Sequence, residues 1–234
     1  MSDGERRTRL MQLAAGAAFL AIAVVLILIV VNSSSSDSGG DSTLEGAADV
    51  NRLLAGIPQD GMTLGDPQAK VQLVEFGDLQ CPVCAAYAEE ILPSIIENQV
   101  KNGEVKVDFR NFTIISEESV AAGAAALAAG EQGRGWQFVE LFYRNQGPEA
   151  SGYADDPEFL KAVAKAAGVK DLARWNAERD QLTPQVEKTT EEAQKLGFDG
   201  TPSFAVKGPG ASGMEAIGTP RSTGDLEAAL EAAG

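Results

Sequence analysis

Apolar and polar positions divide the chain into parts with different patterns, and the first is a continuous apolar run. Residues 10–31 are 22 consecutive uncharged positions, and all but Gln12 are apolar or glycine. As a helix this run is about 33 Å long, which is enough to cross roughly 30 Å of hydrocarbon. It is longer than the apolar core of a signal peptide, and no small-residue cleavage site ends it. We therefore expect residues 10–31 to form an uncleaved transmembrane anchor, with a cleaved signal peptide as the alternative.

The charges on either side of the run predict its orientation. Three arginines precede it and two aspartates follow it, namely Arg6, Arg7, Arg9, Asp37 and Asp41. Basic residues stay on the cytoplasmic side of a membrane helix. The pattern therefore predicts a single-pass protein of the cell membrane, with residues 1–9 in the cytoplasm and everything after the anchor outside it.

The next segment, residues 32–56, has the composition of a tether. Positions 32–42 contain only Ser, Gly, Asp and Asn, which cannot bury enough apolar area to fold. A short helical pattern is visible within 44–55. We expect this segment as a whole to be a flexible linker.

Residues 57–234 carry the mixed strand and helix signals of one α/β domain. Strand patterns at 70–76 and 104–112 flank a helical pattern at 82–101, which the interior Pro93 should kink. Short strand signals return at 203–206 and 215–217, and a last helix follows at 223–233. Between the two halves the pattern is helical only, with five helices expected at 117–129, 135–145, 156–167, 171–180 and 184–196.

Composition and charge narrow the chemistry. The chain has no histidine, which excludes catalytic triads based on histidine and all metal sites with histidine ligands. Its two cysteines are too few for a four-cysteine zinc site within one chain, so we expect no metal. The net charge of −15 repels phosphate backbones, so we expect no nucleic acid partner.

The two cysteines form the one motif with chemistry in it, Cys81-Pro82-Val83-Cys84. The motif follows the strand at 70–76 after a short connection and opens the helix at 82–101. Backbone N–H groups at a helix start have no partner within the helix, and they favour the thiolate of the first cysteine. This spacing is typical of a reversible dithiol. The alternatives are a structural disulfide, a zinc half-site shared between two chains, and an inert buried pair.

Two segments together resemble the thioredoxin superfamily, and within it the DsbA-like thiol-disulfide oxidoreductases of the cell envelope. Residues 75–84, Glu-Phe-Gly-Asp-Leu-Gln-Cys-Pro-Val-Cys, are similar to the strand, loop and active-site helix of that family. Residues 196–206 are similar to its second motif, in which Thr201 precedes a cis-proline, Pro202, that opens a strand. The resemblance covers residues 57–234. It implies a thioredoxin-like α/β fold with a helical insertion at about 116–197, here preceded by the transmembrane helix.

The resemblance also implies roles for individual residues. Cys81 would be the exposed sulfur that substrates attack, and Cys84 would resolve the reaction. Glu75 matches a buried acid that exchanges a proton with the second cysteine; the alternative is a surface glutamate on an edge strand.

The remaining implied site residues bind substrate: Pro82, Val83, Thr201 and Pro202. The dipeptide between the cysteines is often Pro-His in the best-known members, where the histidine helps to stabilise the thiolate. Val83 replaces that histidine here, so a weaker oxidant is expected.

These observations predict a membrane-tethered, extracytoplasmic thiol-disulfide oxidoreductase that introduces disulfides into exported proteins with cysteine thiols. It needs no cofactor, and the family implies reoxidation by a quinone-linked membrane partner. Two alternatives stay open: a reductase or isomerase of the same fold, and a binding or scaffold domain without catalysis.

Overall fold

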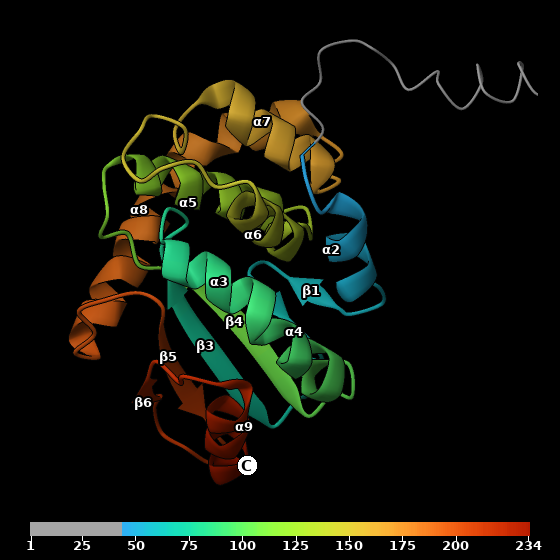
Figure 1. The fold of residues 1–234 in the computed structure, drawn as a ribbon, viewed down its shortest axis with the longest axis vertical. Coiled ribbons are helices and arrows are strands. Elements are labelled where there is room, and N and C mark those ends of the chain that lie inside the picture. Colours follow the sequence, from blue (N-terminus) through green and yellow to red (C-terminus); the bar gives the residue numbers. More distant parts are fainter. Residues whose placement is uncertain (1–43) are drawn as a thin grey trace, which may run out of the picture. The chain divides into compact units, whose positions relative to one another are not determined.

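A mixed β-sheet organises residues 44–234, which are the part of the chain that the computed structural model describes (Figure 1). The strand order is β1-β2-β4-β3-β5-β6, and β3 pairs with β4 in parallel and with β5 antiparallel. The strands are β1 (Gln59–Asp60), β2 (Thr63–Leu64), β3 (Val71–Gly77), β4 (Val105–Asn111), β5 (Ser203–Lys207) and β6 (Glu215–Gly218). The four expected strands are all present. The sequence analysis missed β1 and β2, because a two-residue strand is too short to show an alternating pattern.

Helices that follow or precede the central strands cover one face of this sheet (Figure 1). They are α3 (Pro82–Glu90), α4 (Leu92–Ile95), the π-helical turn η1 (Ile96–Val100) and α9 (Thr223–Ala233). The expected kink at Pro93 is confirmed, because α3 ends and α4 begins on either side of Ile91. An interior proline cannot donate a backbone hydrogen bond, and the helix breaks at Ile91, two residues before Pro93.

Four further helices form a group beyond the end of the sheet where α3 begins, and they make up the expected insertion (Figure 1). They are α5 (Glu118–Gly130), α6 (Gly135–Arg144), α7 (Pro157–Ala166) and α8 (Leu172–Lys195). One expectation is corrected: the two helices predicted at 171–180 and 184–196 are a single helix, with Pro184 inside it. Pro184 and Asp180 are both exposed, so solvent can take the carbonyl that the proline leaves without a donor.

The opposite face of the sheet is covered by the end of α8. Val74 and Phe76 of β3 point to this side and pack with Ala193 of α8, while the Phe198 ring contacts that of Phe76 in a tilted arrangement at a centroid distance of 5.4 Å. Because strand residues alternate between faces, Leu73 and Glu75 point to the other side, beneath α3. β3 is therefore a central strand that is covered on both faces.

The folded unit begins earlier than residue 57. A short helix, α2 (Ala47–Leu53), packs on α6 and buries Val50 and Leu53 in the main core. Residues 44–56, expected as the end of a flexible linker, thus belong to the compact unit 44–234. Two apolar side chains on one helical face are enough to attach so short a segment.

The expected anchor at 10–31 and the tether up to residue 43 lie outside the described residues. Among residues 44–234, no helix has both the length and the hydropathy needed to cross a membrane.

Candidate active site

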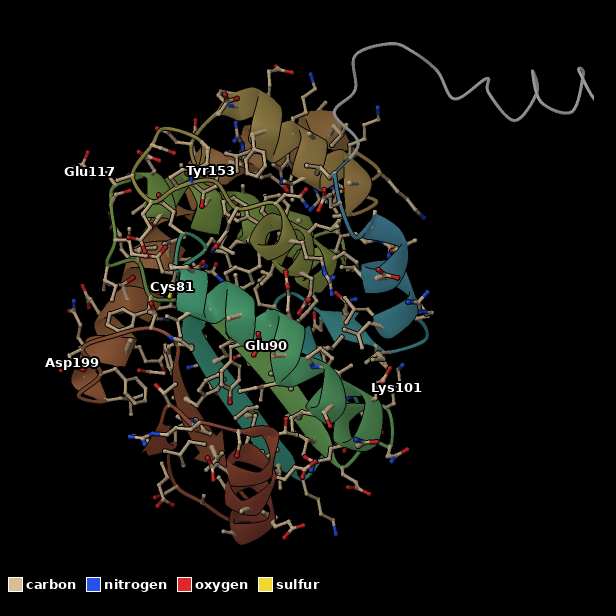
Figure 2. The ribbon with its side chains drawn as sticks, viewed as in Figure 1. Cys81, Glu90, Lys101, Glu117, Tyr153 and Asp199 are labelled. Carbon is tan, nitrogen blue, oxygen red and sulfur yellow. The ribbon has the colours of Figure 1, made fainter. Side chains whose placement is uncertain are left out.

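The two cysteines lie where β3 is joined to α3. Cys81 is the N-cap of α3, and Pro82 occupies its first helical position, where the missing proline N–H costs no hydrogen bond. Figure 2 shows Cys81 at one end of α3 and the exposed Glu90 at the other. Both cysteines are unpaired thiols in this structure.

The Cys81 sulfur receives hydrogen bonds from the start of its own helix. The Cys84 backbone N–H donates to Cys81 Sγ at 3.3 Å, as the helix-start argument predicted. Hydrogen bonds from the Cys84 thiol and from the Thr201 side chain lower the pKa of Cys81 to about 6, against the opposing effect of burial. At neutral pH this sulfur is therefore mainly a thiolate.

One expectation about Cys81 needs correction. The residue is only 5% exposed, whereas the sequence analysis expected an exposed sulfur. The reason is its contact with the loop before β5, where Cys81 Sγ lies 3.5 Å from the Thr201 carbonyl oxygen and donates a hydrogen bond to it in the thiol form.

Cys84 is the fully buried member of the pair, with no exposed surface. Burial and hydrogen bonding to Cys81 both raise the pKa of the Cys84 thiol. The two sulfurs of one motif thus have opposite preferences: Cys81 favours the thiolate and Cys84 favours the thiol.

Glu75 lies on β3 beneath this motif and is 1% exposed, so the surface alternative is excluded. Its Oε1 atom has no hydrogen-bond partner among the described residues. Burial, the Glu140 charge and the Cys81 charge raise the pKa of Glu75 to about 8. A carboxyl of this kind is protonated at neutral pH and can exchange its proton with a nearby group.

The second motif meets the first in space although 120 residues separate Cys81 from Thr201. The Thr201–Pro202 peptide bond is cis, and Pro202 immediately precedes β5. The Thr219 hydroxyl donates to the Pro202 carbonyl. This hydrogen bond attaches the cis-proline loop to the end of β6, which pairs with β5.

Exposed apolar side chains border the cysteines. Val83 is 57% exposed and Ile114 is 43% exposed, and no other large apolar side chain among residues 44–234 is as open to solvent. Ile114 lies beside the site because its backbone N–H donates to Asp78, whose own carbonyl accepts from the Cys81 N–H. The sequence analysis named Pro82 and Val83 as substrate contacts but missed Ile114, which no local motif marks.

Buried polar side chains hold the connection between β3 and α3, and the sequence analysis missed them too. The Asp78 carboxylate accepts from the Gln80, Ile114 and Ile115 backbone N–H groups at 2.9 to 3.1 Å. Gln146 donates to the Leu79 and Cys81 carbonyls. The position of Cys81 is therefore set jointly by β3, by the loop after β4 and by the segment after α6.

Metal ligands are not gathered anywhere in the part of the chain that the structure describes. No three His, Cys, Asp or Glu side chains of residues 44–234 lie close enough together to hold a metal ion. The arrangement offers thiol, carboxyl and hydroxyl chemistry.

Comparison with known proteins identifies the same family as the sequence motifs do, and the similarity extends over most of the chain. The thioredoxin family model matches residues 58–232. The probable disulfide bond formation protein D of Bacillus cereus is 30% identical over 150 residues, which cover 62% of this chain and 69% of that protein. Disulfide bond formation protein D of Bacillus subtilis is 29% identical over 147 residues, covering 61% of this chain and 66% of that protein.

Solved structures show the same fold. Oxidised BdbD from Bacillus subtilis superposes with a TM-score of 0.64 at 24% identity, covering 75% of this chain and 96% of that one. Alpha-DsbA1 from Wolbachia pipientis has a TM-score of 0.63 at 21% identity, covering 79% and 95%. With the Cys81–Cys84 motif, the cis-proline loop and the helical insertion in place, the chain belongs to the thioredoxin family and, within it, to the DsbA-like thiol-disulfide oxidoreductases.

Proposed function

We propose that this protein introduces disulfides into exported proteins through the Cys81-Pro82-Val83-Cys84 dithiol. The observation that carries the proposal is the difference between the two cysteines, in which the pKa of Cys81 is lowered and that of Cys84 is raised. A stabilised Cys81 thiolate favours the reduced form of the protein, so the disulfide form readily donates its disulfide to a substrate. The similarity to proteins named for disulfide bond formation supports the same direction.

The reaction follows from the placement of the groups. In the disulfide form, a substrate thiolate attacks Cys81 Sγ, the Cys81–Cys84 bond breaks, and Cys84 leaves as a thiolate that takes a proton from Glu75. The second substrate thiolate then attacks the substrate sulfur of the mixed disulfide, and Cys81 leaves as the stabilised thiolate. The substrate loses two electrons and the protein gains two.

Substrate binding is assigned to the exposed side of the same site. Pro82 and Val83 on α3 and Thr201 and Pro202 on the facing loop lie on either side of the Cys81 sulfur. An extended substrate segment can pair with the loop backbone in the manner of an added strand, while its apolar side chains contact Val83.

The reduction potential tests the direction of the reaction. We expect a value between those of a strong oxidant, about −120 mV, and of thioredoxin, about −270 mV, because the Cys81 pKa of about 6 lies between about 3.5 for DsbA and about 7 for thioredoxin. Equilibrating the full chain with glutathione buffers and counting free thiols gives the potential.

A value below about −240 mV would instead assign the protein as a reductase. The matched variant Val83→His, which restores the frequent Pro-His dipeptide, should make the potential less negative, because an imidazolium beside Cys81 stabilises the thiolate. A dithiol that forms no reversible disulfide would favour the scaffold alternative.

We also propose that residues 10–31 anchor the protein in the cell membrane, with the folded unit on the outer side, where a quinone-linked membrane partner reoxidises the dithiol. The support is the length of the apolar run and the arginines that precede it.

The anchor is tested on protein isolated from membranes. Mass spectrometry should find residues 10–31 still attached, and deleting them should move the protein into the soluble fraction. A mature species that begins near Ser33 would show that the run is a cleaved signal peptide.

A further inference from the structure

A second buried carboxyl lies close to the site and has no role in the proposed reaction. Glu140 on α6 is 1% exposed, and neither of its carboxylate oxygens has a hydrogen-bond partner among the described residues. Burying a carboxylate without partners costs several kcal/mol, so such a group is neutralised by a proton or serves a purpose that offsets the cost.

The neighbours of Glu140 on α6 show which way it faces. Trp136 precedes it by four residues and Tyr143 follows it by three, so the three side chains share one face of the helix. Both aromatic rings meet Phe109 of β4 edge to face, at centroid distances of 6.5 Å and 6.3 Å. Glu140 therefore lies between them and faces the sheet above Phe109.

Phe109 is also the register partner of Glu75. The two residues are opposite each other in the parallel β3–β4 pair, so their side chains lie on the same face of the sheet. On the other side, Glu75 is opposite Phe204 of β5, whose ring lies 4.6 Å from that of Tyr87 on α3. Glu75 therefore lies between two helix faces. On one side is the face of α6 that carries Glu140, and on the other is the face of α3 that carries Cys84 and Tyr87.

Burial is the largest influence on the pKa of both acids. Arg144 on α6 lowers the pKa of Glu140, Glu89 on α3 raises it by less, and burial outweighs both. Around Glu75, the titratable groups on α3 and α6 are Cys81, Cys84, Tyr87 and Tyr143. The side chains that α2, α5 and α7 bury are apolar apart from Ser119.

Two carboxyls buried in one apolar region cannot both be charged, so they titrate as a pair that holds a common proton over a range of pH. Burial raises the pKa of Glu140 to about 8, and the Glu140 charge is one of the causes that raise the pKa of Glu75. When Glu140 is ionised, its charge therefore makes Glu75 hold its proton more firmly.

We propose that Glu140 is a positioning residue for the dithiol, which forms with Glu75 a buried acid pair and keeps on Glu75 the proton that Cys84 receives when the disulfide opens. The inference rests on the proposed function. The step balances as Glu75 carboxylic acid plus Cys84 thiolate giving Glu75 carboxylate plus Cys84 thiol. Glu140 does not touch the sulfur; its charge raises the proton affinity of Glu75.

The test is the pH dependence of disulfide opening by dithiothreitol, measured on the full chain at a fixed concentration of the dithiothreitol thiolate. In the wild type the rate should fall as pH rises through a midpoint near 8, where Glu75 loses its proton. Glu140→Gln removes the neighbouring charge and should move the midpoint down by about one pH unit. Glu75→Gln should remove the midpoint.

Glu90→Gln is the matched control, because it makes the same chemical change at an exposed position at the far end of α3 (Figure 2). Its midpoint should equal that of the wild type. Glu140→Leu is a second variant without the charge, and it should show the same downward shift if Glu140→Gln folds poorly. We expect the midpoints of Glu140→Gln and Glu140→Leu to agree because both variants remove the carboxyl of Glu140, although their side chains pack differently.

Unchanged midpoints in both Glu140 variants would overturn the proposal and leave Glu140 a structural residue. A flat profile in Glu140→Gln would also overturn it, because Glu140 would then itself be the proton donor. Infrared titration of the buried carboxyl band in the disulfide form separates this inference from the proposed function. The band of Glu140→Gln should titrate about one unit lower even if no substrate protein is ever oxidised.

Discussion

Cys84→Ala should convert the protein into a covalent trap for its substrates. In this variant Cys81 remains a stabilised thiolate, but no second protein thiol is left to release a mixed disulfide. Turnover of a reduced substrate protein should fall to the rate of uncatalysed exchange, while disulfide-linked adducts through Cys81 accumulate. Non-reducing electrophoresis of cell extracts, followed by mass spectrometry of the adducts, detects them.

The matched control for this trap is Cys81→Ala. Cys84 has no exposed surface, and burial raises its pKa, so this variant should form almost no adducts although it keeps one thiol. Equal adduct formation by the two variants would contradict the assignment of Cys81 as the attacked sulfur. The absence of adducts from both would favour the scaffold alternative.

Glu75→Gln should become more stable relative to the wild type as pH rises from about 4.5 to 8. Burial raises the pKa of Glu75 from 4.5 to about 8, so between these values the folded state holds a proton that the unfolded state has released. Stability of the wild type therefore falls with pH in this window, by about 1.4 kcal/mol per pH unit. At pH 7 the accumulated loss is about 3 kcal/mol, and a glutamine does not incur it.

Urea denaturation of the reduced protein at pH 5 and at pH 7 measures this difference. The stability gap between Glu75→Gln and the wild type should widen by about 3 kcal/mol between the two conditions at most, and Glu90→Gln should show no such widening. Because the charge on Glu140 acts on Glu75, the stability gains of Glu75→Gln and Glu140→Gln at pH 7 should not add in the variant that carries both substitutions. A gap that is independent of pH would show that Glu75 is ionised in the folded state.

The sequence by itself determined the features that depend on neighbours along the chain. The spacing of Cys81 and Cys84 after a buried strand places one sulfur at the helix start and the other one turn inside. Helical periodicity between residues 116 and 197 likewise predicted an all-helical stretch, which the family resemblance identified as the insertion, and the mixed strand and helix patterns predicted an α/β domain. Such features follow from local periodicity and from helix-end hydrogen bonding, which need no knowledge of distant contacts.

The tertiary structure decided what depends on contacts between distant segments. Thr201 closes over Cys81 from 120 residues away, so the sulfur expected to be exposed is nearly covered. Gln146 donates a hydrogen bond to the Cys81 carbonyl from 65 residues away, and no sequence motif predicts this contact.

Glu140 shows the physical reason most directly. In the sequence Glu140 is a single acidic residue between Val139 and Leu141. Only the contacts of Trp136 and Tyr143 with Phe109, the register partner of Glu75, place its helix beside Glu75. Whether a carboxyl is solvated or buried without partners changes its pKa by several units, and burial is a property of the packed interior rather than of the residue. The sequence therefore determined which chemical groups are present, and the packing decided which of them carry a proton.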